Sequence, residues 1–104
     1  MVKQISADEV NRAIENPAIA IIDVRTPQEY SKGSIKRSVN IPVDEIAEKI
    51  ESTVPDKNKT IYLYCLSGSR SQMAADILTN LGYVQAFSMS NGLLMWKFKK
   101  YELI

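Results

Sequence analysis

The sequence predicts an α/β fold built around one open parallel sheet. Segments with strand character alternate with segments of helical periodicity along the whole chain, as they do when crossover helices join parallel strands. Residues 18–22 form a continuous apolar run of the kind that becomes a strand buried on both faces. Residues 60–64 lead directly into a small-residue loop and a helix start, the place where open α/β sheets bind their ligands.

The expected elements follow one another without an internal repeat, a linker or a low-complexity segment. Strand character is found in residues 2–5, 18–24, 38–41, 60–64 and 84–89. Helix-start signals or helical periodicity are found in residues 6–16, 26–33, 43–50, 70–81 and 93–104. The sequence therefore predicts a single domain over residues 1–104.

Capping residues, proline and glycine set the boundaries in the first half of the chain. Ser6, with Glu9 three positions later, forms a capping-box pattern for the first helix, and Pro17 ends that helix. Pro27 suits the first position of the second helix, which is short because Gly33 stops it. The apolar strand is therefore expected between two helices.

Apolar periodicity sets the elements in the second half. Apolar side chains recur at helical spacing in residues 43–50, and the polar residues 55–59 form a turn before the next strand. A longer amphipathic helix follows over residues 70–81, and Gly82 caps it. The tail, residues 93–104, sets Trp96 and other apolar side chains against lysines, and we expect a helix with a solvated basic face there.

Charge and hydropathy indicate a protein of the cytoplasm that binds neither nucleic acid nor membrane. The 104 residues include 13 basic and 12 acidic side chains, so the net charge is only +1. No apolar run approaches the ~18 residues needed to span a bilayer. The first residues, 1–4, lack the apolar region of a signal peptide.

The absence of histidine and the single cysteine narrow the possible chemistry. Without histidine there can be no Ser-His or Cys-His pair and no imidazole metal ligand. One cysteine cannot form an internal disulfide, a redox pair or a cysteine-rich zinc site. We therefore expect no metal and no cofactor, and any nucleophile must be activated by backbone and helix electrostatics.

The candidate catalytic residue is Cys65, at the end of the predicted strand 60–64. Small residues after it leave room for backbone N–H groups to converge on the sulfur, and Gly68 permits the backbone angles that such a loop needs. The following helix start and Arg70 favour a thiolate. The competing interpretations are a plain buried thiol for Cys65 and a solvated helix-start side chain for Arg70.

Several segments, taken together and in order, resemble the rhodanese homology domain. The matching segments are Ile22-Asp23-Val24-Arg25 with Glu29-Tyr30 and Gly33, Ser34-Ile35 with Ser38-Val39-Asn40-Ile41-Pro42, Cys65 to Ser71, and Asn91-Gly92 with Trp96. The resemblance implies a five-stranded parallel sheet with helices on both faces. It also implies a sulfurtransferase that carries a sulfane sulfur as a persulfide on Cys65.

The resemblance also implies roles for the neighbouring residues. The expected substrate cradle consists of Leu66, Ser67, Gly68, Ser69 and Arg70. The expected supporting residues are Asp23, Arg25 and Ser71. Asp23 is expected to brace the loop or, alternatively, to tune the pKa of Cys65, and Arg25 is expected to pair with Glu29.

Two other functions remain open at this point. One is a phosphatase or arsenate reductase, although only four residues separate Cys65 from Arg70, a short loop for a tetrahedral oxyanion. The other is a non-catalytic module that binds partners or senses redox state. For sulfur transfer, the expected partners are a small-molecule or protein sulfur donor and a thiol acceptor. Leu66 stands where many family members carry a charged residue, and this leaves a protein or small-thiol persulfide open as the donor beside thiosulfate.

Overall fold

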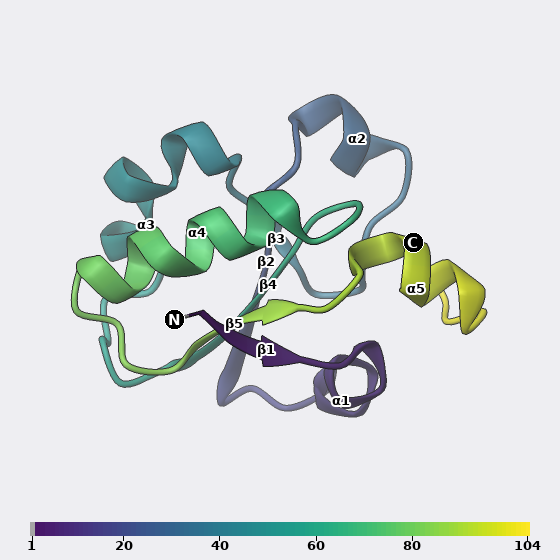
Figure 1. The fold of residues 1–104 in the computed structure, drawn as a ribbon, viewed down its shortest axis with the longest axis horizontal. Coiled ribbons are helices and arrows are strands. Elements are labelled where there is room, and N and C mark those ends of the chain that lie inside the picture. The colour runs from purple at the N-terminus through teal and green to yellow at the C-terminus, as the bar shows by residue number, and fades with distance from the viewer. Residues whose placement is uncertain (1) are drawn as a thin grey trace.

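The computed structural model, which describes residues 2–104, contains one five-stranded sheet surrounded by helices (Figure 1). The strands are β1 (Lys3–Ile5), β2 (Ile19–Asp23), β3 (Val39–Asn40), β4 (Thr60–Tyr64) and β5 (Ala86–Met89). The helices are α1 (Ala7–Ala13), α2 (Pro27–Ser31), α3 (Ile46–Thr53), α4 (Ser69–Asn80) and α5 (Gly92–Phe98), and a 3-10 turn, η1 (Val43–Glu45), precedes α3. Within residues 2–104, no helix combines the length and the apolar character needed to cross a membrane.

The sheet is parallel throughout, in the order β1-β5-β4-β2-β3. This arrangement confirms the predicted α/β class and the five parallel strands. Strand β4 lies in the middle, between β5 and β2, so the loop after β4 emerges at the centre of the carboxyl edge. The most informative segment of the sequence is therefore at the position where such sheets place their sites.

Helices cover both faces of the sheet, as predicted. Helices α3 and α4 lie on one face and α1 and α5 on the other, while α2 follows the carboxyl end of β2 (Figure 1). Successive strand residues point to opposite faces, so Ile22 and Leu63 join the core beneath α3 and α4, whereas Ile21 and Tyr64 join the core beneath α1 and α5. This two-sided burial explains the continuous apolar run of β2.

The largest difference from the sequence prediction is in the C-terminal tail. The predicted helix over residues 93–104 is wrong beyond Phe98, because the chain turns at Lys100, which has a positive φ of 60°. The remaining residues fold back: the backbone of Ile104 pairs with that of Ser34, and Trp96 donates a hydrogen bond to the carbonyl of Glu102. The tail is thus packed against the domain instead of forming a solvated helix.

Candidate active site

Cys65 lies at the first position after β4, and its side chain is completely buried at the base of the β4–α4 loop. Gly68 donates its backbone N–H to the Sγ atom at 3.1 Å. The loop can turn back on the sulfur in this way because Gly68 has a φ of 110°, a conformation that other residues rarely adopt. The predicted role of Gly68 in shaping the loop is confirmed by this geometry.

A pair of buried serine hydroxyls lies beside the thiol. The Oγ atom of Ser71, in the first turn of α4, is 3.7 Å from the Sγ atom of Cys65 and 3.1 Å from the carbonyl oxygen of Gly68. Ser88, from the neighbouring strand β5, is fully buried, and its Oγ atom lies 2.7 Å from that of Ser71. The neutral thiol donates to the Ser71 hydroxyl, which donates in turn to the carbonyl of Gly68. Because a hydroxyl has only one hydrogen, Ser71 can turn that hydrogen from Gly68 to the sulfur once Cys65 is ionised, and it can then accept a hydrogen from Ser88.

The pKa of the Cys65 thiol lies below its ordinary value. Burial by itself raises this pKa, because it disfavours the charged form. Hydrogen bonds from the backbone and hydroxyl of Ser71 and from the backbone amides of Gly68 and Ser67 lower it by more. The site therefore favours a thiolate by means of main-chain and hydroxyl donors, as the lack of histidine requires.

Helix α5 holds the loop from its other side. The N–H groups of Leu93 and Leu94 donate to the carbonyl oxygens of Cys65 and Leu66, at 2.9 and 3.1 Å. Gly92 makes this contact possible, because a Cβ atom at that position would lie 2.5 Å from the carbonyl oxygen of Cys65 and nearer still to that of Leu66. In the sequence this segment stood out only through the family resemblance, and the close approach becomes evident only in three dimensions.

Arg70 forms an ion pair with Glu29 across the mouth of the site. Its two terminal nitrogens lie 2.7 and 3.1 Å from the two carboxylate oxygens, a bidentate geometry. The pair lowers the pKa of Glu29 to about 2. The expected pairing of Glu29 with Arg25 is therefore wrong.

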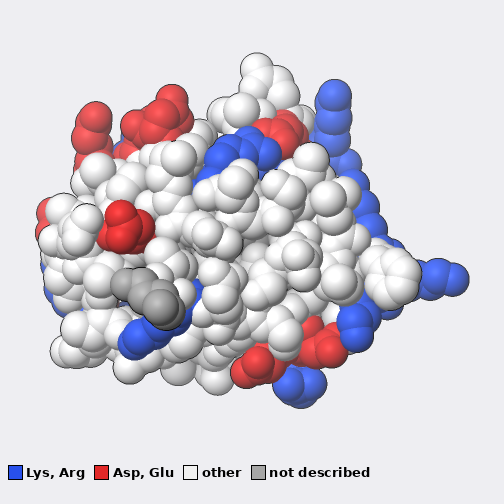
Figure 2. Space-filling model, viewed as in Figure 1, with Lys and Arg blue, Asp and Glu red and all other residues white. Residues whose placement is uncertain are grey.

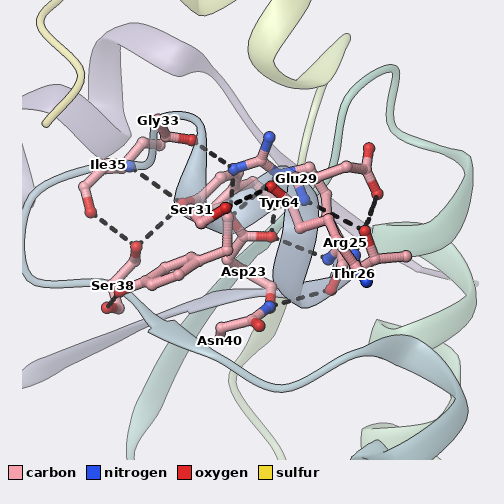
Figure 3. Close-up of polar contacts among 12 residues, drawn as sticks. Asp23, Arg25, Thr26, Glu29, Ser31, Gly33, Ile35, Ser38, Asn40 and Tyr64 are labelled. Carbon is pink, nitrogen blue, oxygen red and sulfur yellow. Dashed lines mark hydrogen bonds and ion pairs between the residues drawn. The ribbon is translucent and has the colours of Figure 1, made fainter.

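Arg25 pairs instead with Asp23, two residues earlier at the end of β2 (Figure 3). The guanidinium is 2.6 Å from one carboxylate oxygen, and it also donates to the carbonyl of Gly33 at 2.7 Å. Asp23 accepts the backbone N–H of Arg25 as well, at 2.8 Å. This carboxylate is therefore engaged within its own turn, and neither the bracing of the loop nor the tuning of Cys65 that was expected of Asp23 is seen among its hydrogen bonds.

The same cluster anchors the residue that precedes the thiol. The buried hydroxyl of Tyr64 accepts the N–H of Ile35 at 3.0 Å and lies 2.9 Å from the hydroxyl of Ser38 (Figure 3). Asn40 bridges the carbonyls of Asp23 and Arg25 at 3.0 Å each. Asp23 and Arg25 thus support the site indirectly, because they fix the ends of β2 and β3 beside β4.

The predicted cradle is brought together only in part. Of its five residues, Gly68 bonds to the sulfur and the amide of Ser67 lowers its pKa, whereas Arg70 is engaged with Glu29. The side chains of Leu66, Ser67 and Ser69 face solvent at the rim. Ser88 was missed, because nothing in the sequence indicates that β5 places its hydroxyl beneath the loop of β4.

A parallel α/β domain with an acidified cysteine at the central strand end defines a class of proteins built for thiolate chemistry. The sequence profile of the family described as "Rhodanese-like domain" matches residues 6–99. The chain belongs to this family.

Three comparisons with known proteins agree with this assignment. The chain is 44% identical over 62 residues to "Thiosulfate sulfurtransferase PspE" of Escherichia coli, covering 60% of each chain. It is 34% identical over 99 residues to "Putative thiosulfate sulfurtransferase, mitochondrial" of Schizosaccharomyces pombe, covering 85% of this chain and 70% of that protein. The crystal structure of a rhodanese-related protein from Thermoplasma volcanium superimposes with a TM-score of 0.82 at 30% identity, covering 98% and 97% of the two chains.

Other relatives show that the family includes further activities. The chain is 28% identical over 102 residues to "tRNA uridine(34) hydroxylase" of Yersinia enterocolitica, covering 94% of this chain. The match covers only 29% of the length of the hydroxylase and 60% of the length of PspE, so in both cases less than two thirds of the relative is covered. The comparisons therefore support a rhodanese-type enzyme without specifying its reaction.

Proposed function

We propose that the protein is a sulfurtransferase that carries sulfur as a persulfide on Cys65. The observation that carries this proposal is the set of polar groups next to Sγ: Gly68 donates its N–H to Sγ at 3.1 Å, and the Ser71 hydroxyl, which accepts the hydrogen of the thiol at 3.7 Å, can donate to the thiolate. Donors that stabilise a thiolate also stabilise the anionic outer sulfur of a persulfide. The relatives that are named thiosulfate sulfurtransferases support the same reaction.

The reaction has two steps, and in each step a nucleophilic sulfur forms a bond to the outer sulfur while that atom's bond to its previous carrier breaks. First, the Cys65 thiolate attacks the outer sulfur of the donor, and the rest of the donor leaves with the electron pair, as sulfite from thiosulfate or as a thiolate from a persulfide. Second, an acceptor thiolate attacks the outer sulfur of the enzyme persulfide. The bond to Sγ breaks, and its electron pair returns to Cys65. Because the chain has one cysteine, the acceptor must be another molecule.

The surroundings of the site favour a persulfide donor over thiosulfate. Thiosulfate is a dianion, and the arginine of the loop is already neutralised by Glu29. The rim position directly after Cys65 is occupied by the apolar Leu66. A free thiol suits a reducing compartment, and a cytoplasmic location is part of this proposal.

Intact-mass analysis tests the proposal. The protein is incubated with thiosulfate, with cysteine persulfide or with an aryl phosphate, and we expect the first two to add one sulfur atom, cysteine persulfide faster. Cys65→Ser should gain no sulfur and should keep its urea unfolding curve. An unchanged mass with both sulfur donors would contradict the proposal. Hydrolysis of the aryl phosphate would favour the phosphatase alternative, and no reaction with any reagent would favour a non-catalytic module.

A further inference from the structure

We propose that the sulfur acceptor is a protein, which docks on an apolar surface beside the loop and presents its cysteine on an apolar segment flanked by acidic residues. The surface, called the α5 platform below, consists of Leu66, Ser67, Asn91, Leu94, Met95 and Phe98. This inference rests on the proposed sulfur transfer and specifies its second substrate.

The α5 platform exposes large apolar side chains next to the catalytic loop. Phe98 is 78% exposed, Leu94 is 56% exposed and Leu66 is 37% exposed. Leu94 and Phe98 are four residues apart on α5 and therefore lie on the same face of the helix. Apolar patches of this kind mark sites of protein interaction, and large apolar and aromatic side chains are the anchors of such interfaces.

A shallow groove runs along the platform and reaches the loop that follows Cys65. It has a volume of about 440 Å³ and is lined by Ser67, Asn91, Leu94, Met95 and Phe98, none of which is charged. Ser67 belongs to the loop that encloses Cys65, so a segment bound in the groove lies against the loop from which sulfur is transferred. The groove thus borders the loop of the proposed reaction site.

The distribution of charge selects the partner. The cation of the loop, Arg70, is neutralised by Glu29, so the mouth offers little attraction to a small anionic thiol. Beyond the platform, α5 and the following turn carry three lysines, of which Lys99 is paired with Asp8. Lys97 and Lys100 are exposed and form no ion pair within residues 2–104.

Figure 2 shows a largely uncharged face that has basic side chains at its border where α5 lies, with acidic side chains beside them along the lower edge. Such a surface complements an apolar segment that ends in acidic residues.

Transfer to this partner follows the second step given above. The partner's cysteine thiolate forms a bond to the outer sulfur of the Cys65 persulfide, the bond between that sulfur and Sγ breaks, and Cys65 leaves as the thiolate. The partner therefore carries the persulfide away, and no further oxidant or reductant is needed. The hydrogen bonds that stabilise the Cys65 thiolate also make it a good leaving group.

Preloaded enzyme persulfide and three acceptors test the inference. The acceptors are dithiothreitol, a peptide with cysteine between leucines and glutamates at both ends, and the same peptide with lysines in place of the glutamates. We expect kcat/KM to be highest for the acidic peptide and to fall with added salt for that peptide alone. Leu94→Ser and Phe98→Ser should each lower kcat/KM for the acidic peptide about tenfold, as loss of an interface anchor does.

Matched variants separate docking from chemistry. Val84→Ser removes an apolar side chain that is 51% exposed near the start of β5, at the opposite edge of the sheet from the site, and should change nothing. Phe98→Ser should leave transfer to dithiothreitol unchanged, and Lys97→Glu should invert the preference between the two peptides.

Equal rates for both peptides, or no effect of the platform variants, would overturn the inference while leaving sulfur transfer intact. Failure to form any persulfide would instead remove the proposed function.

Discussion

Replacing Gly92 by alanine should separate the loop from α5 and impair Cys65. Gly92 has a φ of 52°, and alanine in a left-handed conformation costs roughly 1–2 kcal/mol. The added Cβ would also lie 2.5 Å from the carbonyl oxygen of Cys65, against at least about 3.4 Å for ordinary contact. Since the clash is with backbone, it cannot be relieved by a rotamer change, and overpacking of this kind costs about 1–3 kcal/mol or more. We therefore expect Gly92→Ala to lower the free energy of unfolding by about 2–5 kcal/mol.

Gly82→Ala is the matched control. Gly82 has a φ of 98°, which strains alanine at least as much, but a Cβ atom there would meet only the side chain of Lys57 at 4.0 Å. Backbone strain alone costs of order 1–3 kcal/mol. Urea unfolding measures both losses of stability, and the alkylation rate of the single cysteine reports on the loop.

Only Gly92→Ala should slow alkylation of Cys65 under conditions where the protein is still folded. It displaces the loop that α5 holds, and that loop supplies the N–H groups that stabilise the reactive thiolate. Equal losses of stability in the two variants, together with unchanged alkylation, would refute the reasoning. That result would mean that conformational strain explains both substitutions and that the contact between α5 and the loop has no effect on the thiol.

Three further predictions concern hydrogen bonds and charges near the site. The ion pair with Arg70 keeps the pKa of Glu29 at about 2, below the ordinary 4.5, so its stabilisation is complete above pH 4.5 and is lost as the pH falls toward 2. Each side chain of the pair is about a third exposed, so Glu29→Gln should lower the free energy of unfolding by only about 1 kcal/mol at pH 7. In urea unfolding, the difference between the variant and the wild type should vanish near pH 2. A difference that stays constant with pH would contradict the role of this ion pair in stability. Ser71→Ala should raise the pKa of Cys65 and move its alkylation profile to higher pH, and an unaltered profile would show that the hydroxyl does not act on the sulfur. Tyr64→Phe leaves the buried backbone N–H of Ile35 without its acceptor, so it should lower the free energy of unfolding by about 1–3 kcal/mol, as measured by thermal or urea unfolding. Alkylation of Cys65 should stay unchanged. No loss of stability would mean that another acceptor replaces the hydroxyl.

Much of the fold could be predicted because its signals are local. Ser6 accepts the backbone N–H of Glu9 at 3.1 Å, as the capping pattern required, and Pro27 begins α2. The apolar run of β2 indicated burial on both faces, and together with the alternation of strand and helix segments it predicts a parallel sheet. The position of Cys65 at a strand end, before a left-handed Gly68, follows from the same local reasoning.

The partners of the charged residues could not be predicted, because they depend on contacts between distant segments. Glu29 was the expected partner of Arg25, four positions earlier, but α2 turns it toward Arg70, which is 41 residues away. Asp23, only two residues from Arg25, is left to form the buried pair. The position of Ser88 beside the thiol likewise depends on the register of β5 against β4, which the sequence does not reveal.

Helix α5 links the proposed docking surface to the chemistry of the thiol. The backbone amides of Leu93 and Leu94 hold the carbonyls of Cys65 and Leu66, while the side chains of Leu94 and Phe98 lie on the exposed platform. A partner that packs on those side chains restrains the same helix turn that fixes the loop. Because the N–H of Gly68 acts on the sulfur only while the loop keeps its shape, docking and thiolate stabilisation depend on one element. Variants of the platform should therefore be judged with both the small thiol and the peptide, since only the peptide requires the partner-facing side of α5.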